Sequence, residues 1–178
     1  MKRVLLATAL VFVFASCKNE KKEIDISNTK VEKVEFKSKT LTIDLTVQYA
    51  LNDNIWLFYT EDFEAYKYEV KNAIQKSIKG NEDFQTISFE IPEDVYPQGI
   101  KFLFSNNKSQ KTMALKNIKI HNGKKEFIVD SSNFVSFFNF SKFIDTADGS
   151  VIELIEVDGI YDPNIVSSSQ LNNEIVKF

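Results

Sequence analysis

Cys17 is the only cysteine in the chain, and its thiol is the side chain best suited to covalent modification. Its thiolate form is a soft nucleophile of the kind that alkylation requires. The residues before it begin with the basic pair Lys2 and Arg3 and continue with an uncharged apolar run over residues 4–14. A membrane-spanning helix needs about 20 apolar residues, so this run is too short to span. An export signal has these features in this order: a basic start, a short apolar run and small residues at the cleavage site.

The tetrapeptide Phe14-Ala15-Ser16-Cys17 resembles a lipobox, the motif at which bacterial lipoproteins are cleaved. The resemblance implies a thioether-linked diacylglycerol on Cys17, cleavage before that residue and acylation of its new amine. Two or more acyl chains anchor a protein stably, whereas one chain holds it only marginally. We therefore expect residues 1–16 to be a signal peptide that is removed and Cys17 to carry lipid, including palmitate. The competing interpretations are an uncleaved signal anchor and a buried core cysteine.

Residues 17–32 are expected to be the lipidated cysteine and a flexible tether, because residues 18–32 are polar, charged and poor in large apolar side chains. Their mixture of Lys and Glu also resembles signals that send some lipoproteins to the cell surface, although a solvated linker would look the same. We expect the mature protein to be anchored in the bacterial cell envelope, with the outer membrane favoured. Its domain would face the periplasm or the outside of the cell. Removal of Lys2 and Arg3 changes the formal net charge from −3 to −5. This acidic balance argues against a nucleic-acid partner.

Several kinds of chemistry lack the residues they need. The single histidine, His121, stands beside the turn sequence Asn122-Gly123, and we expect a solvated turn residue there. A catalytic histidine would need partners that orient it. No cysteine follows Cys17, which excludes a disulfide or a thiolate metal site in the mature domain. The five glycines form no phosphate-binding loop. We therefore expect no catalytic residue, no metal and no cofactor.

Pairs of adjacent carboxylate residues raise the alternative that the protein is an enzyme. The pairs are Glu61-Asp62, Glu82-Asp83 and Glu93-Asp94. A glycan hydrolase or lyase would use two carboxylates facing each other across a cleft. All three pairs lie in polar, turn-like stretches, and adjacent residues on a strand point to opposite faces. Solvation of loops is the simpler interpretation of these residues.

Aromatic residues are the better candidates for ligand binding. Four of them lie close together in sequence: Trp56, Tyr59, Tyr66 and Tyr68. Such rings offer a rigid apolar surface with a polar tip, on which the C–H face of a sugar can stack. On one strand, Trp56 and Phe58 should share a face and Tyr59 should lie on the other. Core packing is the stronger interpretation of these rings, because large aromatic residues are mostly buried.

Alternating hydrophobicity predicts an all-β domain over residues 33–178. The clearest strand has an apolar residue at every second position: Leu41, Ile43, Leu45, Val47, Tyr49 and Leu51. Shorter strands are expected near residues 55–59, 87–91, 100–104, 113–120, 127–129 and 151–157. The run 55–59 is continuously apolar, which is typical of a strand covered on both faces. Six or more short strands without a clear long helix predict a single jelly-roll-like antiparallel β-sandwich.

Several local patterns refine this expectation. The alternation changes register between residues 113–115 and 118–120, which predicts a β-bulge at Lys116-Asn117. Asn122-Gly123 predicts a hairpin with a type I′ turn and a returning strand at residues 127–129.

Three segments leave alternatives open. Residues 63–80 fit both a strand and one helical face, and we favour a strand there. Residues 134–143 are rich in phenylalanine and have no clean period. In the tail, apolar residues have helical spacing, and Ser167 and Gln170 ahead of them have capping-box spacing, so a short closing helix or an edge strand is expected.

One family resemblance sharpens the fold. The motifs that carry it are IWLFY (55–59), SIKG (77–80), FQTISFEIP (84–92), IKFLF (100–104), LKNIKI (115–120) and YDPNI (161–165). Their order resembles the jelly-roll, carbohydrate-binding-module-like domains attached to bacterial envelope glycan enzymes. Because these motifs are packing patterns, they imply the fold more directly than the function. Where that family often has an arginine followed by Asp-Pro-Gly, this chain has Phe104-Ser105-Asn106-Asn107, so the role of that segment in relatives is not carried over.

The leading hypothesis is a non-catalytic envelope lipoprotein whose β-sandwich binds a glycan or an envelope protein. The enzyme hypothesis requires facing carboxylates in a cleft. A third hypothesis, a structural or assembly subunit, requires a contiguous exposed apolar patch, for example from residues 134–143.

Replacing Cys17 with serine should leave an unlipidated precursor, because a hydroxyl is a far poorer nucleophile than a thiolate. Fractionation with labelled palmitate checks this expectation: the wild type should enter the membrane pellet and carry label, and the variant should carry none. A protein that starts at Lys33 should be soluble and should fold without the anchor. An unlabelled wild-type protein, or a mature N-terminus other than Cys17, would contradict the lipoprotein interpretation.

Overall fold

The computed structural model describes residues 40–62, 64, 67–146 and 150–178. The expected signal peptide, the lipidation site Cys17, the tether, the start of the domain at residue 33 and the candidate Tyr66 lie outside the described residues. Within the described residues, no helix has the length and apolar character needed to cross a bilayer.

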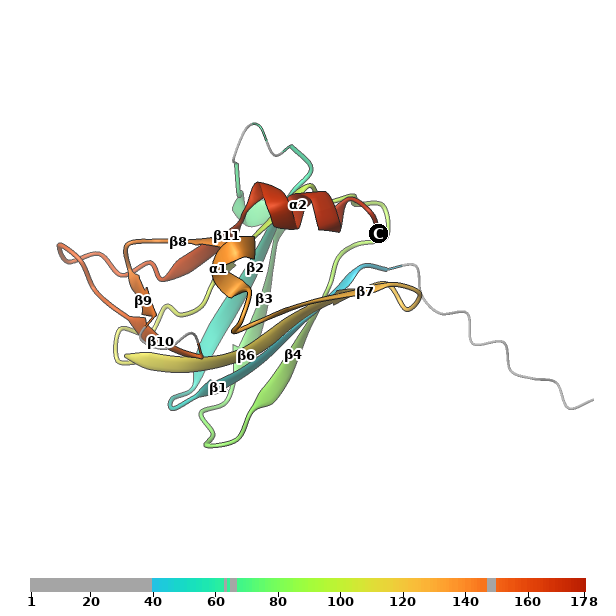
Figure 1. Cartoon of the computed structure of the whole chain (residues 1–178). Coiled ribbons are helices and arrows are strands. Elements are labelled where there is room, and N and C mark those ends of the chain that lie inside the picture. The colour runs from blue at the N-terminus through green and yellow to red at the C-terminus, as the bar shows by residue number, and fades with distance from the viewer. Residues whose placement is uncertain (1–39, 63, 65–66, 147–149) are drawn as a thin grey trace, which may run out of the picture. The chain divides into compact units, whose positions relative to one another are not determined.

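Two antiparallel sheets form a β-sandwich, which confirms the expected all-β, jelly-roll-like fold (Figure 1). The first sheet has the order β4 (Gln85–Glu90), β1 (Thr42–Tyr49), β6 (Thr112–His121), β10 (Val151–Leu154) and β9 (Ile144–Thr146), with β7 (Glu126–Asp130) also paired to β6. The second sheet has the order β3 (Ala73–Ile78), β2 (Asp53–Thr60), β5 (Gly99–Leu103), β11 (Asn164–Ser167) and β8 (Phe138–Phe140). Because the chain passes repeatedly from one sheet to the other, residues far apart in sequence become neighbours.

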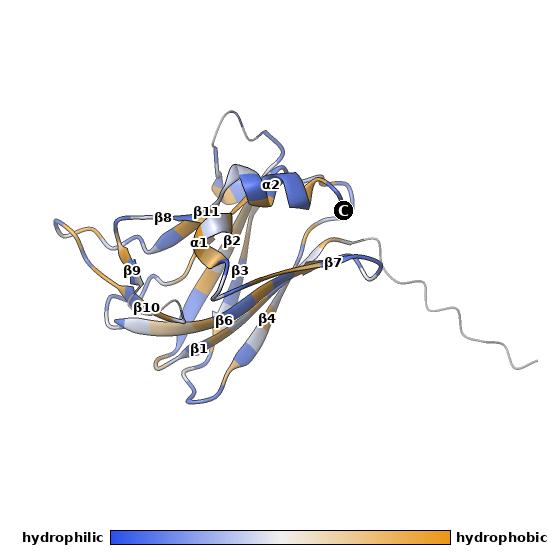
Figure 2. Ribbon diagram, viewed as in Figure 1, coloured by the Kyte–Doolittle hydropathy of each residue, from blue (hydrophilic) through white to orange (hydrophobic). Residues whose placement is uncertain are grey.

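The core lies between the two sheets. Every second residue of β1 points into it, as the sequence predicts, and Ile43, Leu45 and Val47 are fully buried. Ile55 and Leu57 on β2 face them from the other sheet and belong to the same core. The bands of hydrophobic and hydrophilic colour along β6 in Figure 2 show the same alternation. Each buried side chain of this size contributes about 1.5 to 3 kcal/mol, and this burial is the main source of stability.

The β-bulge expected in β6 is confirmed. Thr46 and Val47 on β1 pair with Asn117 and Leu115, so Lys116 is left unmatched across the strand pair. Four residues of β6 on the two sides of the bulge are buried: Met113, Leu115, Ile118 and Ile120. An extra residue changes which residues point inward, and the bulge therefore keeps both halves of β6 in the core.

The hairpin between β6 and β7 is confirmed, but the expected type I′ turn is wrong. Four residues, 122–125, separate the two strands. Gly123 has a φ of 79°, whereas Asn122 does not have a positive φ. A type I′ turn needs a positive φ at both central residues. The Asn122 side chain instead accepts hydrogen bonds from the backbone N–H groups of Lys124 and Lys125, each at 3.1 Å, and organises a longer loop.

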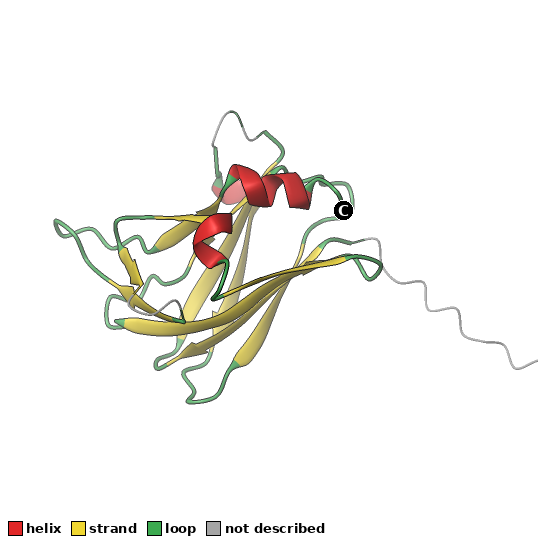
Figure 3. Ribbon diagram, in the orientation of Figure 1, coloured by secondary structure: helices red, strands yellow, loops and turns green. Residues whose placement is uncertain are grey.

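The helices are short, and α1 (Phe134–Phe137) and α2 (Ser169–Ile175) contact each other (Figure 3). The tail therefore forms the short closing helix and not the edge strand. Its N-cap is Ser168, whose hydroxyl accepts a hydrogen bond from the Leu171 N–H at 3.4 Å, and not Ser167 as the spacing predicts. Between β2 and β3, a 3-10 turn at Val70–Asn72 precedes the strand. The favoured strand in residues 63–80 is thus confirmed only for its second half.

The phenylalanine-rich segment packs into the domain. Four of its rings are buried: Phe134, Phe137, Phe138 and Phe143. The Phe134 ring centroid lies 5.2 Å from the centroids of both Phe138 and Phe140. This segment does not form the exposed apolar patch that the structural-subunit hypothesis requires of it.

The segment that departs from the resembled family has a structural role. Ser105 donates a hydrogen bond to the buried carboxylate of Asp53 at 2.5 Å. The Tyr161 hydroxyl lies 3.2 Å from the Ser105 hydroxyl and donates to the Gln110 carbonyl oxygen at 2.7 Å. Burial raises the pKa of Tyr161 above its ordinary value, which keeps the hydroxyl protonated. This network joins the start of β2, the loop after β5 and the loop before β11.

Deletion of Lys116 should prevent stable folding, because a one-residue slip turns one half of β6 away from the core. Exposing Met113 and Leu115 alone would cost about 3 to 6 kcal/mol. Urea unfolding measures this cost. Lys116→Ala is the matched control and should change the unfolding free energy by less than about 0.5 kcal/mol, since Lys116 is exposed. A deletion variant as stable as the control would contradict the role of the bulge.

Candidate functional site

The outer face of the second sheet carries an aromatic platform, which we define as Trp56, Phe58, Lys101, Leu103 and Val166. Directly paired residues of antiparallel strands share one face of a sheet. Trp56 pairs with Leu103, Phe58 pairs with Lys101, and Lys101 pairs with Val166. All five side chains are half-buried, so each keeps part of its surface accessible. The platform therefore runs across three neighbouring strands, β2, β5 and β11.

The two rings of the platform are nearly parallel. The Trp56 and Phe58 ring centroids are 6.2 Å apart, and their planes differ by 20°. The Lys101 Nζ atom lies 5.7 Å from the centroid of the Phe58 ring. Aromatic faces attract cations and also stack against flat apolar groups, including the C–H face of a sugar ring. This surface can take a flat ligand without needing a deep pocket.

Polar side chains lie beside the rings on the same face. Gln75 on β3 is directly across from Trp56, and Ser77 is across from Asn54. The Ser77 hydroxyl donates to the Asn54 side-chain oxygen at 2.9 Å. Gln75 and, on the far edge strand, Asn139 are exposed. Each primary amide offers both donors and acceptors, which suits the hydroxyl groups of a glycan.

The structure places one of the four predicted aromatic residues on this platform. Trp56 lies there with Phe58, as the shared strand face predicts. Tyr59 is only 8% exposed and belongs to the core, because the alternation that exposes Trp56 turns Tyr59 inward. Tyr68 is half-buried and lies off the strands, before the 3-10 turn. Tyr66 lies outside the described residues. The expectation that β2 is covered on both faces is wrong at the platform.

The remaining platform residues come from strands that the sequence identifies but does not pair. In the predicted strand 100–104, the inward alternation of Ile100 and Phe102 already implies that Lys101 and Leu103 point outward. The adjacency of β5 to β2 and β11 requires the sheet order, and that order is not contained in the alternation. Phe58 was identifiable from its shared face with Trp56.

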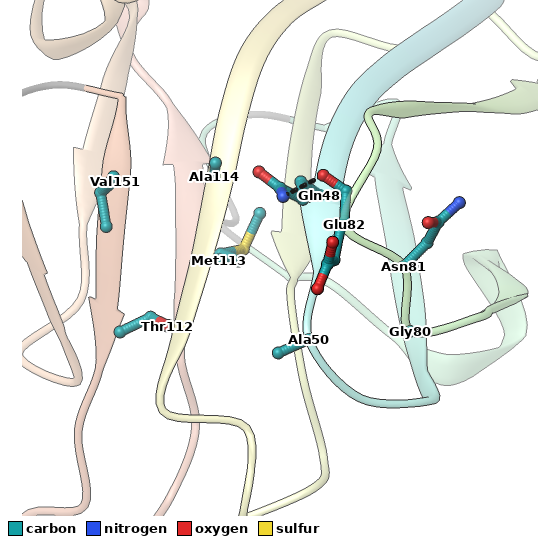
Figure 4. A pocket seen from close by; sticks show the side chains of 9 residues that line it. All are labelled: Gln48, Ala50, Gly80, Asn81, Glu82, Thr112, Met113, Ala114 and Val151. Carbon is teal, nitrogen blue, oxygen red and sulfur yellow. Dashed lines mark hydrogen bonds between the residues drawn. The ribbon is translucent and has the colours of Figure 1, made fainter.

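A separate open hollow of about 450 Å³ lies on the outer face of the first sheet (Figure 4). Its lining residues are Gln48, Ala50, Gly80, Asn81, Glu82, Thr112, Met113, Ala114 and Val151. Gln48 donates a hydrogen bond to the Glu82 carbonyl oxygen, while the Asn81 side chain points away from the other lining residues in Figure 4. Glu82 is the one carboxylate in the lining, and no aromatic ring contributes to it. The hollow thus lacks a stacking surface.

Asp44 is the centre of a polar cluster on the same sheet face. Its carboxylate accepts a hydrogen bond from the Ser88 hydroxyl at 2.6 Å and lies 3.1 Å from His121 Nε2 and 3.3 Å from Lys119 Nζ. Burial acts to raise the pKa of Asp44, but the hydrogen bonds from Ser88, His121 and Lys119 outweigh burial and hold that pKa below its ordinary value. Ser88 contacts Asp44 and not the histidine, so this is not the order of a nucleophilic triad.

His121 is therefore not the solvated turn residue that the sequence predicts. It is the last residue of β6, and its ring contacts Asp44 across the strand pair.

The carboxylate pairs are solvated, as the simpler interpretation predicts. All six residues are exposed: Glu61, Asp62, Glu82, Asp83, Glu93 and Asp94. Glu82 lines the hollow and Asp83 does not. Among the described residues, no group of three or more His, Cys, Asp or Glu side chains is placed to hold a metal ion.

Comparison with known proteins finds no family model, no curated protein and no solved structure that matches this chain.

Replacing Asp44 with asparagine should lower the unfolding free energy by about 1 kcal/mol at pH 5 and above, because a charged acceptor is lost. A folded-state pKa below the unfolded value stabilises the protein above the unfolded pKa, and that contribution is lost as the pH falls through the folded pKa. The gap between wild type and variant should therefore close as the pH falls below about 4, as urea unfolding at each pH would show. Glu90→Gln, at an exposed position on the same face, is the control. A gap that persists at the lowest pH would contradict the charge of Asp44 as its cause.

Proposed function

We propose that this chain is a membrane-anchored lipoprotein of the bacterial cell envelope whose β-sandwich binds a glycan on the aromatic platform without cleaving it. The observation that carries the proposal is the stacked pair Trp56 and Phe58, which lies half-buried on the outer face of the second sheet. Core residues of this fold have their rings between the sheets, and a Trp–Phe pair on the outside needs another explanation. Stacking with a ligand supplies one.

The composition of the platform supports a glycan. Sugars combine apolar C–H faces with many hydroxyl groups, and recognition requires rings for the first and hydrogen-bonding groups for the second. The rings here lie beside the exposed amide of Gln75. At the outward positions of the described strands, the platform presents no carboxylate. Glycoside cleavage generally uses two carboxylates, so this face is suited to binding.

The anchor completes the proposal. Lipid on Cys17 would hold the domain at the membrane, and the polar residues after it would let the platform reach a glycan of the envelope. This part of the proposal is supported by the sequence of residues 1–32 alone.

The chain contains one tryptophan, so fluorescence excited at Trp56 reports directly on the platform. Glycans selected on an array with the mature protein should change this emission in a saturable way. Trp56→Ala should weaken binding, measured by calorimetry, by roughly tenfold or more, because a central aromatic residue carries a large share of binding energy. Tyr96→Ala is the matched control, since Tyr96 is an exposed aromatic residue outside the platform, and it should bind like the wild type. Binding that survives Trp56→Ala would place the glycan elsewhere, and an array without any bound glycan would contradict the proposal.

A further inference from the structure

Lys101 is the central cation of the platform. It lies on β5, the middle strand of the five-stranded sheet, and its side chain is half-buried on the outer face. A continuous row crosses the sheet at this level: Ala73, Phe58, Lys101, Val166 and Asn139. Lys101 is therefore a central residue of the platform and not a residue of its rim.

Lys101 forms no salt bridge with the described residues, in contrast to other lysines of the domain. Lys119 pairs with Asp44 on the first sheet, and Lys177 pairs with Glu174 on α2. Lys101 instead contacts the Phe58 ring, and its Nζ atom lies 5.7 Å from the ring centroid. A cation–π contact at an accessible site contributes only about 0.5 to 1 kcal/mol. It orients the ammonium group over the platform without neutralising it.

The strand positions around Lys101 carry no acidic residue; the Asp162 carboxylate, just before β11, accepts a hydrogen bond from Asn164 at 2.9 Å. The residues at the described outward positions of this sheet are Asn54, Trp56, Phe58, Thr60, Ala73, Gln75, Ser77, Gly99, Lys101, Leu103, Asn139, Asn164 and Val166. None of them is acidic, although the whole chain has a formal net charge of −3. A lysine ammonium that forms no salt bridge with the described residues can pair with an anion brought by the ligand.

We propose that the ligand of the platform is an anionic glycan, whose carboxylate, sulfate or phosphate group pairs with Lys101 while a sugar ring stacks on Trp56 and Phe58. This inference rests on the proposed glycan-binding function and names the class of glycan. Phe58 and Lys101 are direct neighbours on adjacent strands. Trp56 lies two residues before Phe58 on the same strand. Adjacent strands lie about 4.8 Å apart, and alternate residues about 6.8 Å apart, so ring and charge fit within one or two sugar units.

The test compares one glycan with and without its charge. Trp56 emission is titrated with oligogalacturonate, with its carboxyl-reduced neutral counterpart, and with a sulfated galactan oligosaccharide, which carries sulfate but no carboxylate and therefore separates the two kinds of recognition. The wild type should bind an acidic probe roughly tenfold more tightly than the neutral one at about 50 mM NaCl, and the preference should shrink at about 500 mM. Lys101→Met keeps the alkyl stem and should bring the ratio of acidic to neutral affinity down to about one. Lys101→Arg should retain the preference, and Lys116→Met, which changes an exposed lysine on the other sheet, should behave as the wild type.

The outcomes separate the two proposals. Equal binding of acidic and neutral probes, with no effect of Lys101→Met, would overturn the anionic ligand and leave the glycan platform standing. No binding of any glycan, by titration or on the array, would overturn the platform itself. Circular dichroism shows whether Lys101→Met folds. If it does not, two other measurements test the anionic ligand: whether Lys101→Arg keeps the preference for the acidic probe, and whether this preference of the wild type falls with salt.

Discussion

The alternation of side chains along each strand is the constraint on which the rest of this molecule depends. A strand that buries Ile55, Leu57 and Tyr59 between the sheets must turn Trp56 and Phe58 outward, because successive residues point to opposite faces. The described domain contains no cysteine, so the core is its main source of stability. The requirements of the core thus determine which residues are available to the surface. The platform is the reverse side of the same strands that hold the sandwich together.

Period-two patterns made most of the fold predictable. β1, β4, β5 and β7 lie where apolar alternation places them, and even the bulge at Lys116 could be read from a change of register. Turn geometry was less predictable, since Asn122 uses its side chain to build a four-residue loop in place of a tight turn. The phenylalanine-rich segment was the least predictable. Its rings pack at a junction of α1, β8 and neighbouring elements, where no single period applies.

The candidate site divides in the same way. Trp56 and its partner Phe58 follow from one strand, and they could be identified from the sequence. Lys101 comes from a strand that lies more than 40 residues away along the chain, and its position beside Phe58 depends on sheet order. Tyr59 is near Trp56 in sequence but lies in the core, which confirms for this residue the stronger interpretation of the aromatic residues. Residues that act together on a sheet surface are joined through strand pairing, and a local pattern cannot supply that information.

The same geometry bears on how the protein behaves at high concentration. A flat face with two aromatic rings, Leu103 and Val166 is a surface on which a second molecule could stack, and exposed apolar patches favour self-association. Face-to-face stacking of two copies centred on the platform would bring two Lys101 side chains close to each other, since Lys101 lies on the middle strand of the sheet. Mutual repulsion of these groups opposes such a dimer.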